Sequence, residues 1–500
     1  MSRSWFASRP RAAGVLLHPT SLPGGPVGTL GREAFLFVER LARAGATVWQ
    51  LLPLLPGGDD GSPYNGLSGF AGNPLLVSGE VLAEEGLTDP APAPPHTPRA
   101  DFAAARRLSI ELVTKAYRAF RDGAVPQLRG PFADFQSRHA HWLDDYSLFV
   151  ALKGEEAGRP WTEWEPRFRD RNQQALAGAR RELAEAVGRE KFAQLLFDRQ
   201  WRSIRSYARA RGVELFGDLP IFVAHDSADV WAHRDLFKLD REGRAEVVTG
   251  VPPDYFSEDG QKWGNPHYRW DSHRATGYGW WSARMRRSLE LFDLVRVDHF
   301  RGFEAAWEVP AEAESAREGR WAPGPGAELF RAARQTLGTL PLVAEDLGVI
   351  TPGVNRLRDA LGLPGMRVLQ FGFDGNPANP HLPGNHPRNS VAYTGTHDND
   401  TALGWYRSAA QAERELFHRY CGGAPDEPHL TLAGLALGSR ARLAVLPAGD
   451  LLGLGSEARM NTPGTVRGNW RWRLGPDQFG PQAVSLLGEM IHLGRRVPEG

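Results

Sequence analysis

The stretch Asp293-Leu-Val-Arg-Val-Asp-His-Phe-Arg-Gly302 places charged side chains at the end of a short apolar run. Residues 294–297 predict a buried strand, and side chains two positions apart on a strand share one face. Arg296 and Asp298 therefore point the same way. The guanidinium favours the ionised form of the carboxyl, which suits a carboxylate nucleophile. A structural Arg–Asp pair at a strand end is common, so this stretch alone leaves both interpretations open.

Two further apolar runs end in acidic residues. They are Leu342-Val-Ala-Glu345-Asp346 and Ser390-Val-Ala-Tyr-Thr-Gly-Thr-His397-Asp398-Asn-Asp400. In a parallel barrel the carboxyl ends of the strands converge on one face, so acids far apart in sequence can meet there. The three segments together predict one shared site.

The fold prediction is an α/β protein, a (β/α)8 TIM barrel. Helical patterns separate most of eight candidate strands, which is the alternation that builds such folds. Strand order alone does not exclude an open doubly wound sheet. No G-x-G-x-x-G motif follows a strand, which argues against a dinucleotide-binding Rossmann enzyme. The candidate strands are 14–17, 47–52, 213–218, 294–297, 342–345, 367–371, 390–394 and 442–446.

Two segments are too long to be simple crossovers of a single catalytic barrel spanning residues 1–500. Residues 57–212 predict an inserted, mostly helical subdomain, with helical patterns at 101–122, 142–153 and 173–209. Residues 225–290 predict an inserted aromatic-rich loop region over the active site. The density of Gly, Pro and Asn between 250 and 266 predicts no regular element there, and long loops in compact domains are often functional.

Composition excludes several classes of protein. The 59 basic and 59 acidic residues balance, so we expect no nucleic-acid partner and no membrane surface. The single cysteine, Cys421, excludes an intramolecular disulfide and fits a reducing compartment. No run approaches the roughly twenty apolar residues of a membrane span. None of the few lysines follows a glycine-rich loop or a clear strand end, which disfavours a pyridoxal-phosphate enzyme. We expect a cytoplasmic monomer.

Three segments resemble the catalytic segments of the amylomaltases, which are 4-alpha-glucanotransferases or disproportionating enzymes related to the alpha-amylase clan. They are Arg-Val-Asp-His-Phe-Arg-Gly (296–302), Ala-Glu-Asp-Leu-Gly (344–348) and Gly-Thr-His-Asp-Asn-Asp-Thr (395–401). The resemblance extends from His18 to Arg473. Its long matches, at 218–224 and 254–266, are specific to this family rather than to the amylase clan at large.

The resemblance implies roles for three acids. Glycosidic bonds are cleaved by two carboxyls, one acting as nucleophile and one delivering a proton to the leaving oxygen. Asp298 suits the first role. Glu345 suits the second, because burial and the nearby Asp298 and Asp398 should raise its pKa. Asp398 should stabilise the positive charge that develops at the anomeric carbon.

The remaining candidates are substrate-binding residues. Sugars present apolar C–H faces and hydroxyl rims, so an aromatic face beside amides and carboxylates makes a suitable surface. The histidines next to the acids should donate to sugar hydroxyls. The substrate-binding candidates are Arg296, His299, His397, Tyr64, Ser62, Asp218, Asp254, Gln261, Trp263 and Asn461.

Rival chemistries have weaker support in the sequence. A zinc site around His397 lacks a second histidine at ligand spacing, and no G-x-S-x-G elbow follows a strand. We therefore predict no metal, and the resemblance implies no cofactor. The expected activity is retaining transfer of an alpha-1,4-glucan segment to the 4-hydroxyl of glucose or another glucan, or to the same chain in a cyclisation. An alpha-1,4-glucan hydrolase of the same fold and a non-catalytic glucan-binding protein remain the alternatives.

Overall fold

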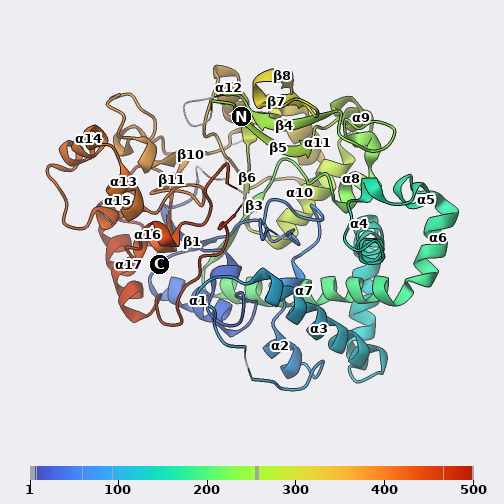
Figure 1. Cartoon of the computed structure of the whole chain (residues 1–500). Coiled ribbons are helices and arrows are strands. Elements are labelled where there is room, and N and C mark those ends of the chain that lie inside the picture. The colour runs from blue at the N-terminus through green and yellow to red at the C-terminus, as the bar shows by residue number, and fades with distance from the viewer. Residues whose placement is uncertain are drawn as a thin grey trace.

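Eight parallel strands form a closed barrel in the computed structural model, which describes residue 6 and residues 8–58, 60–92, 94–253, 258–465 and 467–497 (Figure 1). Around the barrel the strands follow the order β1-β12-β11-β10-β9-β6-β3-β2. The predicted barrel is confirmed, and all eight expected strands belong to it. They are β1 (Ala12–Leu16), β2 (Val48–Gln50), β3 (Glu214–Leu219), β6 (Leu294–Val297), β9 (Leu342–Ala344), β10 (Gly365–Val368), β11 (Ser390–Tyr393) and β12 (Leu443–Pro447).

Helices connect most of the barrel strands. In α1 (Arg32–Arg43) the apolar residues Ala34, Phe37, Val38 and Leu41 are spaced to form one buried face. The crossover from β10 to β11 contains no α-helix among its described residues, only the short 3-10 turns Leu369–Phe371 and Pro383–Asn385. The other crossover helices are α10 (Gly279–Leu291), α11 (Ala327–Leu337), α12 (Pro352–Leu361), α13 (Ala402–Ser408), α14 (Gln411–Cys421) and α15 (Pro428–Gly438); α16 (Ala448–Leu451) and α17 (Pro481–Leu493) follow β12.

The chain between β2 and β3 is mostly helical, as its sequence pattern indicates. Local signals define the helix ends: Asp101 caps the first turn of α3 by accepting from the Ala104 backbone N–H at 2.9 Å. The long helices α4 and α7 pack against each other. This part of the chain contains α2 (Gly79–Glu84), α3 (Phe102–Arg121), α4 (Arg129–Glu155), α5 (Pro166–Arg169), α6 (Gln173–Glu182) and α7 (Ala184–Ala210).

A four-stranded antiparallel sheet stands beside the barrel, with the strand order β5-β4-β7-β8 (Figure 1). The prediction that 250–266 holds no regular element is therefore wrong, and 225–290 is not simply a loop region. It contains α8 (Ala228–Ala232), β4 (Val247–Val251), β5 (Gln261–Pro266), α9 (Trp270–Ala275) and most of α10; β7 (Ala305–Pro310) and β8 (Arg320–Pro323) complete the sheet.

Pairing with distant residues explains why the composition of this sheet misled the prediction. β4 pairs with β7, more than fifty residues further along the chain. Gly250 is needed where β4 and β5 come close, because a Cβ there would lie 2.1 Å from the carbonyl oxygen of Gln261. The register between β4 and β5 shifts at this point, as in a β-bulge.

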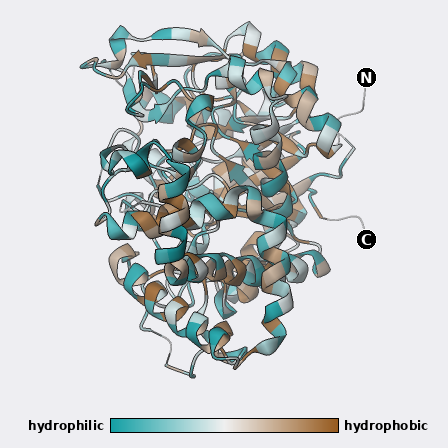
Figure 2. Cartoon of the chain, turned by 90° about the vertical axis from the view of Figure 1, so that its right-hand side faces the viewer, coloured by the Kyte–Doolittle hydropathy of each residue, from teal (hydrophilic) through white to brown (hydrophobic). Residues whose placement is uncertain are grey.

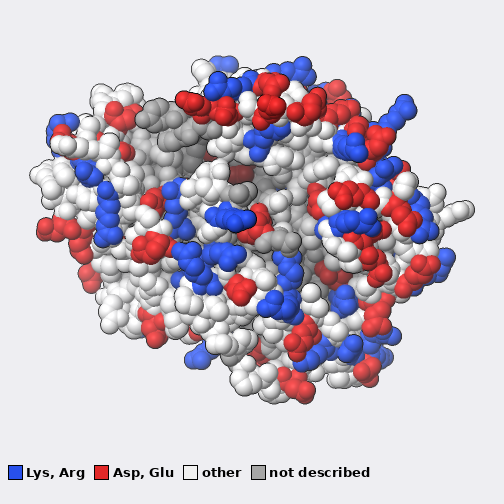
Figure 3. Space-filling view, viewed as in Figure 1, with Lys and Arg blue, Asp and Glu red and all other residues white. Residues whose placement is uncertain are grey.

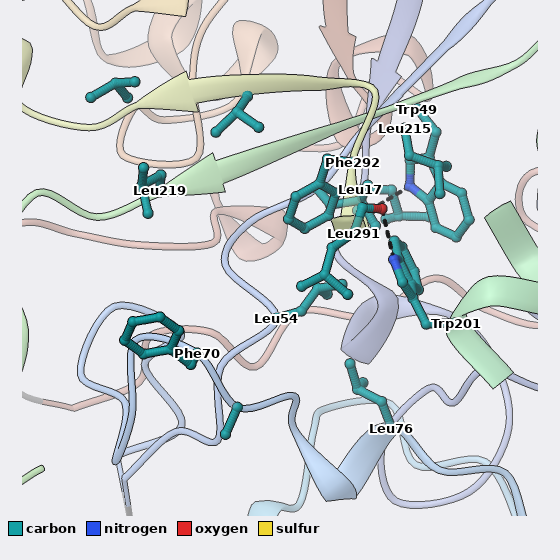
Figure 4. Packing of buried hydrophobic residues seen from close by; sticks show 14 of the residues in the cluster. Leu17, Trp49, Leu54, Phe70, Leu76, Trp201, Leu215, Leu219, Leu291 and Phe292 are labelled. Carbon is teal, nitrogen blue, oxygen red and sulfur yellow. Dashed lines mark hydrogen bonds between the residues drawn. The ribbon is translucent and has the colours of Figure 1, made fainter. Parts of the chain in front are cut away.

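The core joins the barrel to the helices around it, and buried indoles show how (Figure 4). Trp49 of β2 donates its Nε1–H to the carbonyl of Leu17 at 2.8 Å. Trp201 of α7 donates in the same way to the carbonyl of Leu291 at 2.9 Å. Both indoles are fully buried. Each ring therefore contributes a large apolar surface without leaving its polar atom unpaired.

On the face seen in Figure 3, neither sign of charge dominates. Acidic and basic side chains are interspersed on the face of Figure 3. Hydrophilic residues recur along the helices (Figure 2), and none of the helices in the described ranges is both long and apolar enough to cross a membrane.

Candidate active site

The register of three neighbouring strands brings the predicted acids together. Asp218 of β3 lies opposite Arg296 of β6, and Val297 of β6 lies opposite Ala344 of β9. The residues that follow, Asp298 and Glu345, therefore leave the barrel side by side. The face seen in Figure 3 is hollowed near its centre, over β6, and acidic atoms lie in the hollow. This is the carboxyl end of the strands, where active sites of such barrels are found.

Arg296 lies between two carboxylates. It donates to Asp218 Oδ2 at 2.6 Å and to Asp298 Oδ1 at 2.9 Å. Its own side chain is 4% exposed and that of Asp218 is 0% exposed, whereas the Asp298 side chain is 27% exposed. Asp298 is therefore the carboxylate of this group that remains accessible to solvent. Direct sugar contact by Asp218, expected from sequence, does not agree with its complete burial.

Glu345 is the buried acid of the site. Burial raises the pKa of its carboxyl to about 8, Arg296 opposes the rise, and Asp298 and Asp346 reinforce it. The two carboxyl oxygens accept backbone N–H groups, Oε2 from His299 at 2.7 Å and Oε1 from Leu347 at 2.9 Å. These bonds fix the orientation of the group. At neutral pH the carboxyl therefore holds a proton beside an arginine-paired Asp298.

His299 adopts a strained backbone conformation, with φ 45° and ψ 50°. Residues other than glycine rarely occupy this left-handed region, and such strain clusters at functional sites. Here the backbone N–H of His299 donates to Glu345. Burial lowers the pKa of the imidazole to about 3, so the ring is neutral at pH 7. Its Nε2 has no hydrogen-bond partner in the part of the chain that the structure describes.

The loop after β11 brings in the third acid. The Asp398 side chain is 43% exposed, and its Oδ1 accepts from the Asn461 side chain at 2.6 Å. Arg459 donates to the Asp398 backbone carbonyl at 2.7 Å and to that of Asn461 at 2.8 Å. Asn461 therefore positions Asp398 through a contact that joins segments 63 residues apart.

Tyr64 connects this loop to the barrel. Its hydroxyl donates to Asp218 Oδ2 at 2.8 Å and lies 2.9 Å from His397 Nε2. Burial lowers the pKa of His397, and the tautomer with hydrogen on Nε2 can donate to the phenol oxygen. The two rings stack with centroids 5.3 Å apart. Ser62 accepts from the Tyr64 backbone N–H at 3.3 Å, so its hydroxyl holds the turn that carries the ring.

The antiparallel sheet contributes an exposed aromatic residue. Trp263 of β5 is 39% exposed and meets the edge of His299 with ring centroids 4.9 Å apart. Its indole donates to Gln261 Oε1 at 3.2 Å. Trp263 therefore lies against the residue that follows Asp298, and Gln261 lies beside Trp263. Asp254, the remaining candidate, lies outside the described residues.

Sequence reasoning missed two contributors to the site. Asp450, buried in α16, accepts from the Thr394 hydroxyl and from the Ala402 backbone N–H, and so joins the two ends of the loop that carries Asp398. Asp450 stands three residues after β12. A search for acidic residues just after each candidate strand would therefore have found it. Trp470 packs against Tyr64 at 5.8 Å. No local sequence signal marks Trp470, because its partner is distant in the chain.

A metal centre has no ligand set within the described ranges. No three His, Cys, Asp or Glu side chains converge there in a way that could hold an ion. The chemistry available to this site is that of a proton-bearing carboxyl, an accessible carboxylate and neutral hydrogen-bonding groups.

Comparisons with known proteins agree with this geometry. A family model described as 4-alpha-glucanotransferase matches residues 17–477. The 4-alpha-glucanotransferase of Thermus thermophilus is 50% identical over 500 residues, covering 98% of this chain and 99% of that protein. That of Synechocystis sp. is 46% identical, covering 97% and 98%. The solved amylomaltase from Streptococcus agalactiae in complex with acarbose has a TM-score of 0.92 at 34% identity, covering 97% and 100%. This chain therefore belongs to the 4-alpha-glucanotransferase family.

Proposed function

We propose that this protein transfers a segment of an alpha-1,4-glucan to the 4-hydroxyl of glucose or of another glucan, with retention of configuration. The donor is a glucan or maltooligosaccharide, and the same step closes a ring when the acceptor is the far end of the donor chain. The enzyme works as a cytoplasmic monomer without a cofactor.

Transfer proceeds in two displacements. The Asp298 carboxylate attacks the anomeric carbon while Glu345 gives its proton to the departing 4-oxygen, which leaves a glucosyl ester on Asp298. Glu345, now ionised, takes the proton of an acceptor 4-hydroxyl. That oxygen attacks the same carbon, the ester bond breaks, and Asp298 and the protonated Glu345 are restored.

One observation carries this proposal: a buried carboxyl lies beside a second carboxyl that is paired with an arginine and accessible. Glu345 keeps its proton because burial raises its pKa to about 8. Asp298 is paired with Arg296 at 2.9 Å and stays accessible. Carboxyls separated in this way by their environments are the pattern of an acid and a nucleophile working together.

The other residues of the site contact the sugar and do not exchange protons or form bonds at the glycosidic linkage. Asp398, oriented by Asn461, faces the positive charge that builds up at the anomeric carbon. The Nε2 of His299 is buried without a hydrogen-bond partner among the described residues, which leaves it to pair with a hydroxyl of a bound sugar. Trp263 offers an exposed ring for the C–H face of a glucosyl unit.

Incubation with pure maltotriose tests the reaction class. Glucose together with maltopentaose and longer chains, at a constant number of reducing ends, is the expected result. A rising number of reducing ends without longer chains would instead establish a hydrolase. No change in either would favour a glucan-binding protein.

The nucleophile is tested by Asp298→Asn. This variant should lose nearly all turnover, because an amide cannot form the ester, while it still binds maltooligosaccharide. Asp359→Asn is the matched control, since Asp359 is an exposed acid on α12 whose side chain is 66% accessible. Near-normal turnover by the Asp298 variant would contradict the assignment.

A further inference from the structure

A second cavity, of about 330 Å³, lies between α4, α8 and α10, on the side of the molecule where Figure 1 shows α4 and α8. We call it the α4/α8 cavity. None of the active-site candidates described above lines it. Its volume falls within the range of small-molecule sites. Residues of three kinds contribute to its wall: aromatic rings, polar side chains at the rim and small apolar residues of the helices.

Three aromatic rings form one part of the wall. Phe70 and Trp142 stack at an interplanar angle of 13° with centroids 6.3 Å apart. Trp280 meets Phe70 edge-on at 5.9 Å. Phe70 and Trp142 are buried, and Trp280 is the ring of the three that is partly exposed. Aromatic walls of this kind suit a ligand with apolar C–H faces.

Two of the three acids that line the cavity, Asp145 and Asp229, are already compensated. Asp145 pairs with Arg171 at 2.9 Å and with Arg180 at 3.4 Å. Asp229 accepts the backbone N–H of Gly69 at 2.7 Å, and burial raises the pKa of its carboxyl. Neither carboxyl therefore offers a free charge to a cationic ligand.

Two buried arginines lie over rings of the cavity wall without lining the cavity themselves. Arg287 lies 5.7 Å from the ring centre of Trp142, and Arg284 lies 5.5 Å from that of Trp280. Both arginines are buried. Their charge disfavours a cation against the same rings, and no Lys or Arg among the described residues lines the cavity to bind a phosphate. The walls therefore suit an uncharged ligand.

The rim offers hydrogen-bonding groups to such a ligand. His141, His233, Asp235 and Thr276 line the cavity. Burial lowers the pKa of His141, so its imidazole is neutral and presents one donor and one acceptor. Hydroxyl groups are both donors and acceptors and can bond to all four side chains. Aromatic rings and a rim of hydrogen-bonding side chains, one of which is the carboxyl of Asp235, are the two halves of a carbohydrate site.

We propose that the α4/α8 cavity binds glucosyl units of a maltooligosaccharide as a second sugar site, distinct from the barrel mouth. The choice of glucose over another neutral sugar rests on the proposed function. The loop of Ser68 and Phe70 continues from Tyr64, so the two sites are built on one segment of chain. A long glucan held here is tethered while another segment occupies the barrel mouth, which raises its effective concentration there.

The test counts binding sites by calorimetric titration with maltotetraose. The titrated protein carries Asp298→Asn, so that the sugar is not consumed. Two sites per chain are expected. Adding His233→Ala and Asp235→Ala should remove one site and leave the other. Asp271→Ala is the matched control, because Asp271 is a nearby acid, 93% exposed, that does not line the cavity, and it should keep both. A single site before the double change, or two sites after it, would overturn the proposal.

Turnover separates this proposal from the function on which it rests. With Asp298 intact, the double change should leave maltotriose transfer unaltered and raise the KM for long amylose at least about tenfold. An unchanged KM for amylose would refute the tethering. Absence of any transfer by the unaltered chain would refute the proposed function. The number of sugar sites found by titration would then still show whether the α4/α8 cavity binds a sugar.

Discussion

Replacing Glu345 with Gln should change how the stability of the protein depends on pH. Burial raises the pKa of this carboxyl from 4.5 to about 8. Between these values the folded chain holds a proton that the unfolded chain has lost, so raising the pH favours unfolding. One pH unit is worth about 1.4 kcal/mol, and the whole window corresponds to about 5 kcal/mol. The amide of Gln does not titrate and lacks this dependence.

The substitution also changes the stability of the protein by an amount that does not depend on pH. Both carboxyl oxygens accept backbone N–H groups, from His299 and Leu347. The NH2 of Gln must face one of these donors and leaves it unpaired, at a cost of about 1–3 kcal/mol. This cost is the same at every pH. The test therefore takes the difference in unfolding free energy between the native protein and Glu345→Gln, and measures how that difference changes with pH.

Equilibrium urea unfolding at about pH 5 and about pH 7.5 measures that change. Across this interval the native protein should lose about 3 kcal/mol relative to Glu345→Gln. Glu111→Gln serves as a control, because Glu111 is an exposed glutamate on α3, and it should show no such drift. A difference that stays constant with pH would mean that Glu345 is already ionised in the folded protein. It would then not be the proton donor, and the expected fall of native kcat above about pH 8 would also be absent.

Two further changes test the surroundings of the acids. Tyr64→Phe keeps the ring stacked on His397 but removes the hydroxyl bonded to Asp218, so kcat on maltotriose should fall about tenfold with little change in Tm. An unaltered kcat would mean that this hydroxyl has no catalytic role. Asp450→Ala removes the acceptor for the Thr394 hydroxyl and the Ala402 N–H, which should lower the free energy of urea unfolding by about 1–3 kcal/mol and lower kcat as well. Asp450→Asn keeps one acceptor oxygen and should recover part of both losses. Equal stability of the Ala variant and the native chain would contradict this.

Barrel strands were predictable because their signal is local. Short apolar runs that end in acidic residues mark both the strand and the face on which it ends. Asp298 and Glu345 could be assigned to one site in this way, because parallel strands share the direction of their carboxyl ends. Local reasoning failed for residues 250–266, where it predicted no regular element. The pairing that makes β4 and β5 a sheet comes partly from β7, and no local pattern encodes a partner so distant.

Burial and contacts between loops were likewise beyond the sequence. Asp218 reads as one more acid at a strand end, yet its side chain is fully buried against Arg296. Nothing local pairs Asn461 with Asp398 or Asp450 with Thr394, since each contact joins segments that approach only when the barrel closes.

The sequence by itself determined the barrel, the acids at its mouth and the family to which they belong, because strand periodicity and short motifs are properties of neighbouring residues. Only the tertiary structure decided which acid is buried and protonated and which stays accessible. The protonation state of a carboxyl depends on desolvation and on charges brought near it by distant segments, and these exist only once the chain has folded.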